Sequence, residues 1–196
     1  MINKRIRGVG GLVAAAFAGV AISIVGIHAG GAVSSAPVAG VYPDPRITPG
    51  AADTLDVAAL NRRYNGLTYS QSHRKVSSAT KKQVYKNAGV PYPQKAGRYE
   101  VDHFWPLCAG GSNDIKNLWL EPASVSLKGK ALGFHQKDLL EAAICRKIRD
   151  GSISSEELRD LFGQFIIDWV KVYRGMKLDR ENEGLKKMGK VPDLVE

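Results

Sequence analysis

The feature that most constrains this chain is a turn rich in glycine and proline between two short apolar runs, in residues 98–122. Residues 98–103 have the β-branched and aromatic content of a strand, and residues 117–121 predict the return strand, which a proline ends. The sequence therefore predicts an antiparallel hairpin whose first strand ends in the adjacent pair Asp102 and His103.

Helices are predicted on both sides of this hairpin. Residues 78–89 predict a short helix with Ser78 as its N-cap, and residues 131–150 predict a longer one with an apolar residue every fourth position. Ser154 and Glu157 form the sequence pattern of a capping box and begin a third helix with a broad apolar face. The expected fold class is α+β, with a strand–strand–helix unit set in a small, mainly helical domain.

The chain divides into four segments. Residues 1–36 combine a basic start with an uncharged apolar run of about 20 residues, which predicts a signal peptide or a membrane anchor. Both alternatives place the remainder outside the cytoplasm, secreted, periplasmic or tethered, and the membrane is involved only through this segment. Residues 37–56 predict a Pro/Gly-rich linker or arm, residues 57–175 the folded domain with its motif in 98–140, and residues 176–196 a disordered tail.

Positive charge is concentrated in one stretch next to the hairpin. The 196-residue chain has a formal charge of +9, and residues 57–99 contain no acidic residue. Such a stretch suits a polyanion, although a solvated basic face is the simpler alternative. Lys81, Lys82, Arg98 and, on the later helix, Lys137 are the candidates for nucleic-acid contacts. The basic residues of the stretch are Arg62, Arg63, Arg74, Lys75, Lys81, Lys82, Lys86, Lys95 and Arg98.

Four polar residues have the types needed for metal-assisted phosphodiester cleavage. A neutral histidine can take a proton from water, and a divalent ion can stabilise charge on phosphoryl oxygens. We expect His103 to be the general base, and Asp102 and His135 to be metal ligands. Asn117 is expected to hold the far ring nitrogen of His103 or to brace the turn. Glu100, one strand period from Asp102, is a weaker candidate ligand.

Cys108 and Cys145 are the only cysteines in the chain. In an oxidising compartment they can pair, and the bridge would join the hairpin turn to the helix that carries His135. The alternative is two separately buried thiols. A zinc site built on paired cysteines is excluded by their spacing.

These residues resemble the HNH endonuclease superfamily, whose ββα-metal unit is two strands, a turn and a helix around one metal ion. The resemblance extends over residues 41–174 to a subgroup of small exported bacterial HNH proteins. The matching motifs are Asp102-His103, Pro106-Leu107, Gly110-Gly111-Ser112-Asn113-Asp114, Asn117-Leu118-Trp119, Glu121-Pro122 and His135-Gln136-Lys137-Asp138.

A ligand sphere of one carboxylate and one imidazole leaves positions open for water and phosphate oxygens, which favours a hard ion such as Mg²⁺ or Mn²⁺. The resemblance implies a metal-dependent enzyme that hydrolyses DNA, with RNA as a second candidate substrate. It assigns the base to His103, metal contacts to Asp102 and His135, and a structural role to Asn117. Low sequence specificity is expected because no recognition module is evident, and no protein partner is implied. The alternative is a non-catalytic exported protein that binds nucleic acid or the cell envelope on a decayed HNH scaffold.

Overall fold

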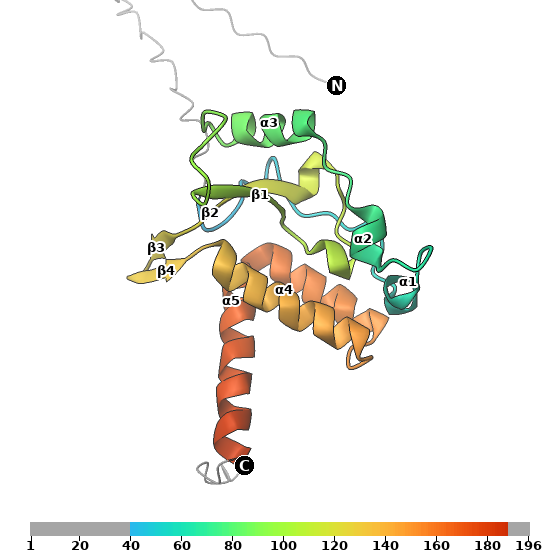
Figure 1. Ribbon diagram of the computed structural model, residues 1–196. Helices are drawn as coiled ribbons and strands as arrows, with labels where there is room; N and C mark the ends of the chain where they lie inside the picture. The colour runs from blue at the N-terminus through green and yellow to red at the C-terminus, as the bar shows by residue number, and fades with distance from the viewer. Residues whose placement is uncertain (1–39, 188–196) are drawn as a thin grey trace, which may run out of the picture. The chain divides into compact units, whose positions relative to one another are not determined.

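The computed structural model describes residues 40–187, and it has an α+β fold (Figure 1). The predicted signal or anchor segment lies outside the described residues. The elements are α1 (Val57–Asn61), α2 (Tyr69–His73), α3 (Ser78–Asn87), β1 (Tyr99–His103), η1 (Leu107–Ala109), η2 (Ile115–Asn117), β2 (Leu118–Pro122), β3 (Val125–Leu127), β4 (Lys130–Leu132), α4 (Phe134–Arg149) and α5 (Ser155–Lys187).

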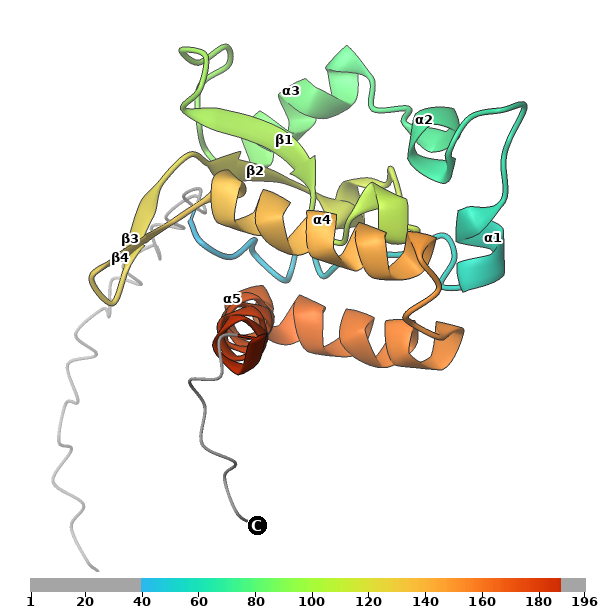
Figure 2. The same ribbon diagram turned by 60° about the horizontal axis from the view of Figure 1, so that its bottom comes forward.

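The predicted hairpin is present as β1 and β2, paired antiparallel with His103 opposite Leu118. It lies between α3 on one face and α4 on the other, with α5 beyond α4 (Figure 2). Because side chains alternate along a strand, Val101 and Leu120 face α3, where they pack with Val84. Trp119 faces the other way and belongs to the main core under α4 and α5.

The Pro/Gly-rich segment before α1 is an arm that packs on the domain. Thr48 is buried, and its hydroxyl donates to the carbonyl of Leu118. Ala52 pairs with Gly111 of the turn, and the indole of Trp169 in α5 donates to the carbonyl of Val41. The arm therefore contacts both the hairpin and the last helix.

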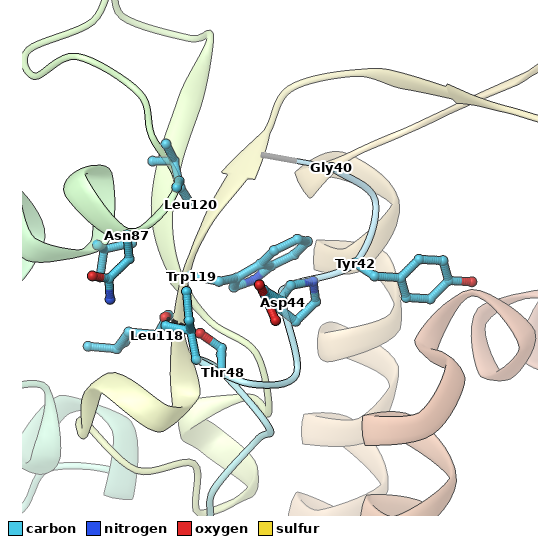
Figure 3. A pocket seen from close by; sticks show the side chains of 12 residues that line it. Gly40, Tyr42, Asp44, Thr48, Asn87, Leu118, Trp119 and Leu120 are labelled. Carbon is cyan, nitrogen blue, oxygen red and sulfur yellow. Dashed lines mark hydrogen bonds between the residues drawn. The ribbon is translucent and has the colours of Figure 1, made fainter. Parts of the chain in front are cut away.

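A cavity of about 40 Å³ lies between this arm, the end of α3 and β2 (Figure 3). Tyr42, Asn87 and Leu120 are among the residues around it. Because one water needs roughly 10–15 Å³ of such space, the cavity has room for a few waters and not for a nucleotide. It is not a candidate site.

The last helix begins with the predicted capping box. The backbone amide of Ser154 donates to Glu157, and the amide of Glu157 donates to the Ser154 hydroxyl. The backbone leaves helical geometry at Asp168, and the helix then continues to Lys187. The helix thus includes residues 176–187 of the segment for which the sequence predicted a disordered tail. Leucine, lysine, arginine and glutamate in this segment favour helix, and the prediction gave too much importance to its charge.

Two other elements differ from the sequence prediction. β3 and β4 form a short hairpin over residues where a helix start was expected, so α4 begins at Phe134. Lys128 and Gly129 both have positive φ in its turn, which matches a two-residue hairpin loop. The N-cap of α3 is Ser77, one residue before the predicted position.

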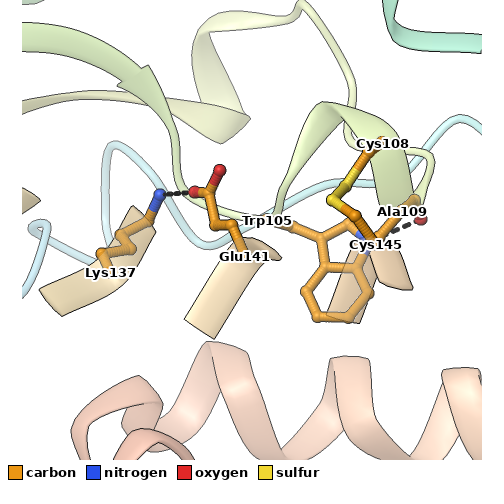
Figure 4. The surroundings of a disulfide bond; sticks show 6 residues. All are labelled: Trp105, Cys108, Ala109, Lys137, Glu141 and Cys145. Carbon is orange, nitrogen blue, oxygen red and sulfur yellow. Dashed lines mark hydrogen bonds and ion pairs between the residues drawn. A yellow bond between two sulfur atoms is a disulfide. The ribbon is translucent and has the colours of Figure 1, made fainter. Parts of the chain in front are cut away.

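Cys108 and Cys145 form a disulfide between η1 and α4 (Figure 4). The bridge closes a loop with a sequence separation of 37. It fixes the turn after β1 against the middle of α4. Within residues 40–187, no helix has the length and apolar character that a membrane crossing requires.

Candidate active site

His103 is the last residue of β1 and is buried, with 3% of its surface exposed. Its ring Nε2 lies 3.2 Å from the side-chain oxygen of Asn113 in the turn. The two polar atoms of Asn113 can be assigned from their other partners. Its nitrogen donates to the backbone carbonyl of His73, and its oxygen accepts from the backbone amide of Lys75.

This network fixes the tautomer of His103. Because the Asn113 oxygen is an acceptor, Nε2 of His103 must carry the proton. In the neutral ring, Nδ1 then keeps its lone pair, which is the atom that a general base uses to take a proton from water. The proton acceptor of the neutral ring is therefore Nδ1.

The surroundings of His103 also favour its neutral form. Burial lowers the pKa of the imidazole, and the positive charges of Arg74 and Lys137 lower it further. The hydrogen bond to Asn113 and the charge of Asp102 act in the opposite direction and do not reverse the shift. His103 is therefore largely uncharged at neutral pH.

Lys137 is the centre of an ionic network between β1 and the first turns of α4. Its side chain is completely buried. The ammonium donates to Asp102 at 2.5 Å, to the backbone carbonyl of His103 at 2.8 Å, and to Glu141 one turn further along the helix. Figure 4 shows the ion pair with Glu141. A phosphate contact by Lys137 does not agree with this position, because three protein oxygens already hold its ammonium.

Three carboxylates converge on the face of the hairpin turned toward α4. Glu100 and Glu121 lie directly opposite each other in the strand register, and Asp102 follows two residues along β1. One oxygen from each of the three lies within 4.8 Å of the others. Glu121 is fully buried, and its nearest positive charge, Nζ of Lys137, is 3.7 Å away.

The surroundings shift the pKa values of these carboxylates in opposite directions. Burial would raise the pKa of Asp102, but the charge and hydrogen bond of Lys137 outweigh it and hold this pKa below its usual value. Burial raises the pKa of Glu121 well above its usual range, and neighbouring carboxylates add to this. Burial likewise raises the pKa of Glu100, and that of Glu141 to about 8. The single positive charge of Lys137 therefore does not offset the effect of burial on the pKa values of Glu100, Glu121 and Glu141.

Asn117 braces the turn and does not bond to His103. Its side-chain oxygen accepts from the backbone amides of Trp105 and Ala51, and its nitrogen donates to the carbonyls of Trp105 and Ser112. The buried amide thereby joins the arm, the turn and the end of β1. Of the two expected roles, bracing the turn agrees with this geometry, and Asn113 takes the place beside the base.

His135 lies in the first turn of α4 and is exposed. Burial raises the pKa values of Glu100 and Asp138, and His135 makes a small opposing contribution to both, so it lies within electrostatic reach of the cluster. The three converging carboxylates do not include it. Its role as a metal ligand stays a prediction. Lys81 and Lys82 on α3 and Arg98 before β1 are exposed, as phosphate contacts would require.

Four functional candidates were not selected from the sequence, namely Arg74, Asn113, Glu121 and Glu141. Asn113 stands in the turn motif, but its contact to His103 depends on how the turn closes. Glu141 has a visible signal, because it follows Lys137 at the helical spacing of four residues. Arg74 belongs to the basic stretch, and only the fold brings it near His103.

Comparison with known proteins gave no match: no family model, no curated sequence and no solved structure is significantly similar to this chain. The fold is therefore assigned as α+β from its own elements. Any function follows from the chemistry of the site.

Proposed function

We propose that this protein is an HNH-type endonuclease that hydrolyses nucleic-acid phosphodiester bonds with the help of a divalent metal ion. The observation that carries the proposal is the contact between Nε2 of His103 and the acceptor oxygen of Asn113, which leaves Nδ1 as the proton acceptor of the neutral ring. The order of β1, β2 and α4 also agrees with the strand–strand–helix unit that the resemblance implies.

His103 would take a proton from a water molecule at Nδ1 while Asn113 holds Nε2–H, so that the ring keeps its orientation as it becomes charged. Asp102 precedes it in β1 and is close enough for its charge to act on the imidazole, and its lowered pKa keeps this carboxylate ionised. A bound Mg²⁺ or Mn²⁺ would supply stabilisation of charge on the phosphoryl and leaving oxygens. Arg74 is exposed and close enough to affect His103, and it would hold the substrate phosphate.

The charge distribution supports a polyanionic substrate. The lysines of α3, the helix that follows Arg74 in the chain, are exposed as well. A second basic region is a pocket of about 440 Å³ near the end of α4, lined by Arg62, Arg63, Arg149 and the disulfide. No carboxylate is among its lining residues. Contacts that use phosphates alone give binding with little sequence preference, first to DNA and also to RNA.

Plasmid nicking with Mg²⁺ or Mn²⁺ tests the proposal. His103→Ala should reduce the rate at least 100-fold, the usual contribution of a general base, and added imidazole should restore part of it. His73→Ala is the matched control, because it removes a neighbouring imidazole while its backbone carbonyl still holds Asn113. Cleavage by His103→Ala at the parental rate would refute the role of His103.

The alternative function is an exported binding protein that contacts nucleic acid or the cell envelope without cleaving it. The exposed basic residues favour this reading as well, since binding alone does not need His103. Gel-shift and cleavage assays on one preparation separate the two. Retained binding without cleavage at any metal concentration would favour the binding protein.

The expected location is outside the cytoplasm, secreted or attached to the membrane by the N-terminal segment. The disulfide between Cys108 and Cys145 supports this, because such bonds persist in oxidising compartments.

A further inference from the structure

The strand register of the hairpin contains an unfavourable feature. Glu100 and Glu121 are a directly opposed pair, and Asp102 lies on the same face. Like charges directly opposite on an antiparallel pair are destabilising. A sequence selected only for hairpin stability would place apolar or oppositely charged residues at these positions, so the repulsion indicates a ligand that removes it.

Glu121 gives the strongest evidence for such a ligand. Its side chain has no exposed surface, and neither of its oxygens has a hydrogen-bond partner among the described residues. Buried polar groups are nearly always hydrogen-bonded, and a buried carboxylate without a partner is costly. Its distance of 3.7 Å from Nζ of Lys137 allows attraction and is too long for a hydrogen bond.

The charges of the cluster are not balanced. One ammonium, that of Lys137, faces the carboxylates of Asp102, Glu121 and Glu141, and Glu100 lies beside them. Lys137 makes its hydrogen bonds to Asp102, Glu141 and the backbone carbonyl of His103. Glu121 and Glu100 therefore receive no hydrogen bond from Lys137, and a second cation is needed to balance their charge.

The spacing fits a single ion. Oxygen ligands lie about 2.0–2.6 Å from Mg²⁺ or Ca²⁺, so two ligands of one ion are at most about 5 Å apart. The three carboxylates already meet this condition with one oxygen each, within 4.8 Å of one another.

We propose that Glu100, Asp102 and Glu121 form a divalent-cation site whose protein ligands are all carboxylates. Such a donor set selects the hard ions Mg²⁺, Mn²⁺ and Ca²⁺ over Zn²⁺. It differs from the set of Asp102 and His135 that the resemblance implies, because glutamates from both strands replace the helix histidine. The inference deepens the proposed function by naming the ligands of its metal, and it is tested without any measurement of cleavage.

The test is titration of the chelator-treated, full-length protein with Mn²⁺, followed by calorimetry and by the loss of the free Mn²⁺ electron-spin signal. The parent should bind one Mn²⁺. Glu121→Gln should weaken binding at least tenfold. In the presence of chelator it should unfold at a denaturant concentration no lower than that of the parent, because it replaces a buried carboxyl group that makes no hydrogen bond. Glu100→Gln, at a partly exposed position, gives a second test that does not change the buried layer.

Two further variants decide between ligand sets. Asp138→Asn removes a nearby exposed carboxylate that is not in the triad and should bind Mn²⁺ as the parent does. His135→Ala should also keep the parental affinity, whereas loss of binding there would favour the aspartate–histidine set and overturn the proposal. Absence of Mn²⁺ binding by the parent, or parental affinity in both glutamine variants, would overturn it as well. One bound Mn²⁺ without nuclease activity would leave this site intact and refute the proposed function instead.

Discussion

Replacement of Lys137 by methionine is the most direct test of the ionic network between β1 and α4. Methionine keeps most of the length and volume of the side chain, so the change removes the charge and leaves little cavity. Removing one partner of a buried ion pair costs about 3–5 kcal/mol, because the remaining charges stay buried without compensation. Lys137 is fully buried and holds two carboxylates and the carbonyl of His103, so the upper part of this range is expected.

The measurement is urea unfolding at pH 7, followed by tryptophan fluorescence, together with thermal melting. For a domain of this size, 3–5 kcal/mol corresponds to a melting temperature lower by roughly 6–20 °C. Lys147→Met is the matched control, because Lys147 is exposed on the same helix, and its effect should stay within about 0.5 kcal/mol. A loss of less than 1 kcal/mol in Lys137→Met would refute the reasoning.

The pH dependence of this loss has a definite sign. A carboxyl group with a raised folded-state pKa contributes stability below its unfolded pKa, near 4.3 for glutamate, and this stability is lost as the pH rises through the folded value. Burial already raises the pKa of Glu141 to about 8, even though Lys137 lowers it, and the methionine variant removes that opposing effect. The deficit should therefore be smallest at acid pH, where Asp102 is protonated in the variant, and grow as the pH rises and Asp102 ionises without its partner. It should grow again above pH 8, where the parent ionises Glu141 more readily than the variant does, and exchanging Glu141 for glutamine in the variant should remove that second increase.

Three other changes give separate tests. Asn113→Asp places a full negative charge beside Nε2 of His103, so the acid limb of the pH–rate profile should move to higher pH; an unchanged limb would remove Asn113 from its positioning role. Asn117→Ala leaves four backbone groups without their buried partner and should cost about 3 kcal/mol or more in urea unfolding, unless water replaces the amide. Reduction of the bond between Cys108 and Cys145 should destabilise the fold by about 4 kcal/mol in the chain-entropy treatment, seen as a lower melting temperature with dithiothreitol; equal melting with and without reductant would contradict this.

The hairpin and the helices were predictable because their signals are local. The turn residues before Asn117 and the capping box at Ser154 depend on neighbours within a few positions, and both features are present. The turn at Lys128 and Gly129 was missed because lysine is uncommon at positive φ. The continuation of α5 to Lys187 was missed because a charged composition was taken for disorder.

The site was only partly predictable, because its main contacts join distant segments. Lysine is usually a surface residue. The burial of Lys137 follows from its partners on β1, which lie 34 and 35 residues away in the chain. Asn113 meets His103 across a closed turn and is held by the backbone near His73, 40 residues earlier. The sequence indicated Asp102 and His103 as candidate site residues. It could not show that Glu121 faces Glu100, since that follows only from the strand register.

The double attachment of Lys137 has a mechanical consequence. One side chain holds both the main-chain oxygen of His103 and a carboxylate of its own helix, so the first turns of α4 and the end of β1 are coupled and must shift together. A change in the C-terminal half of α4, such as reduction of the disulfide at Cys145, would therefore be transmitted to the imidazole ring of His103. The nuclear magnetic resonance signals of that ring would then report events on a helix, although the hydrogen bond of its own side chain goes to Asn113 in the turn.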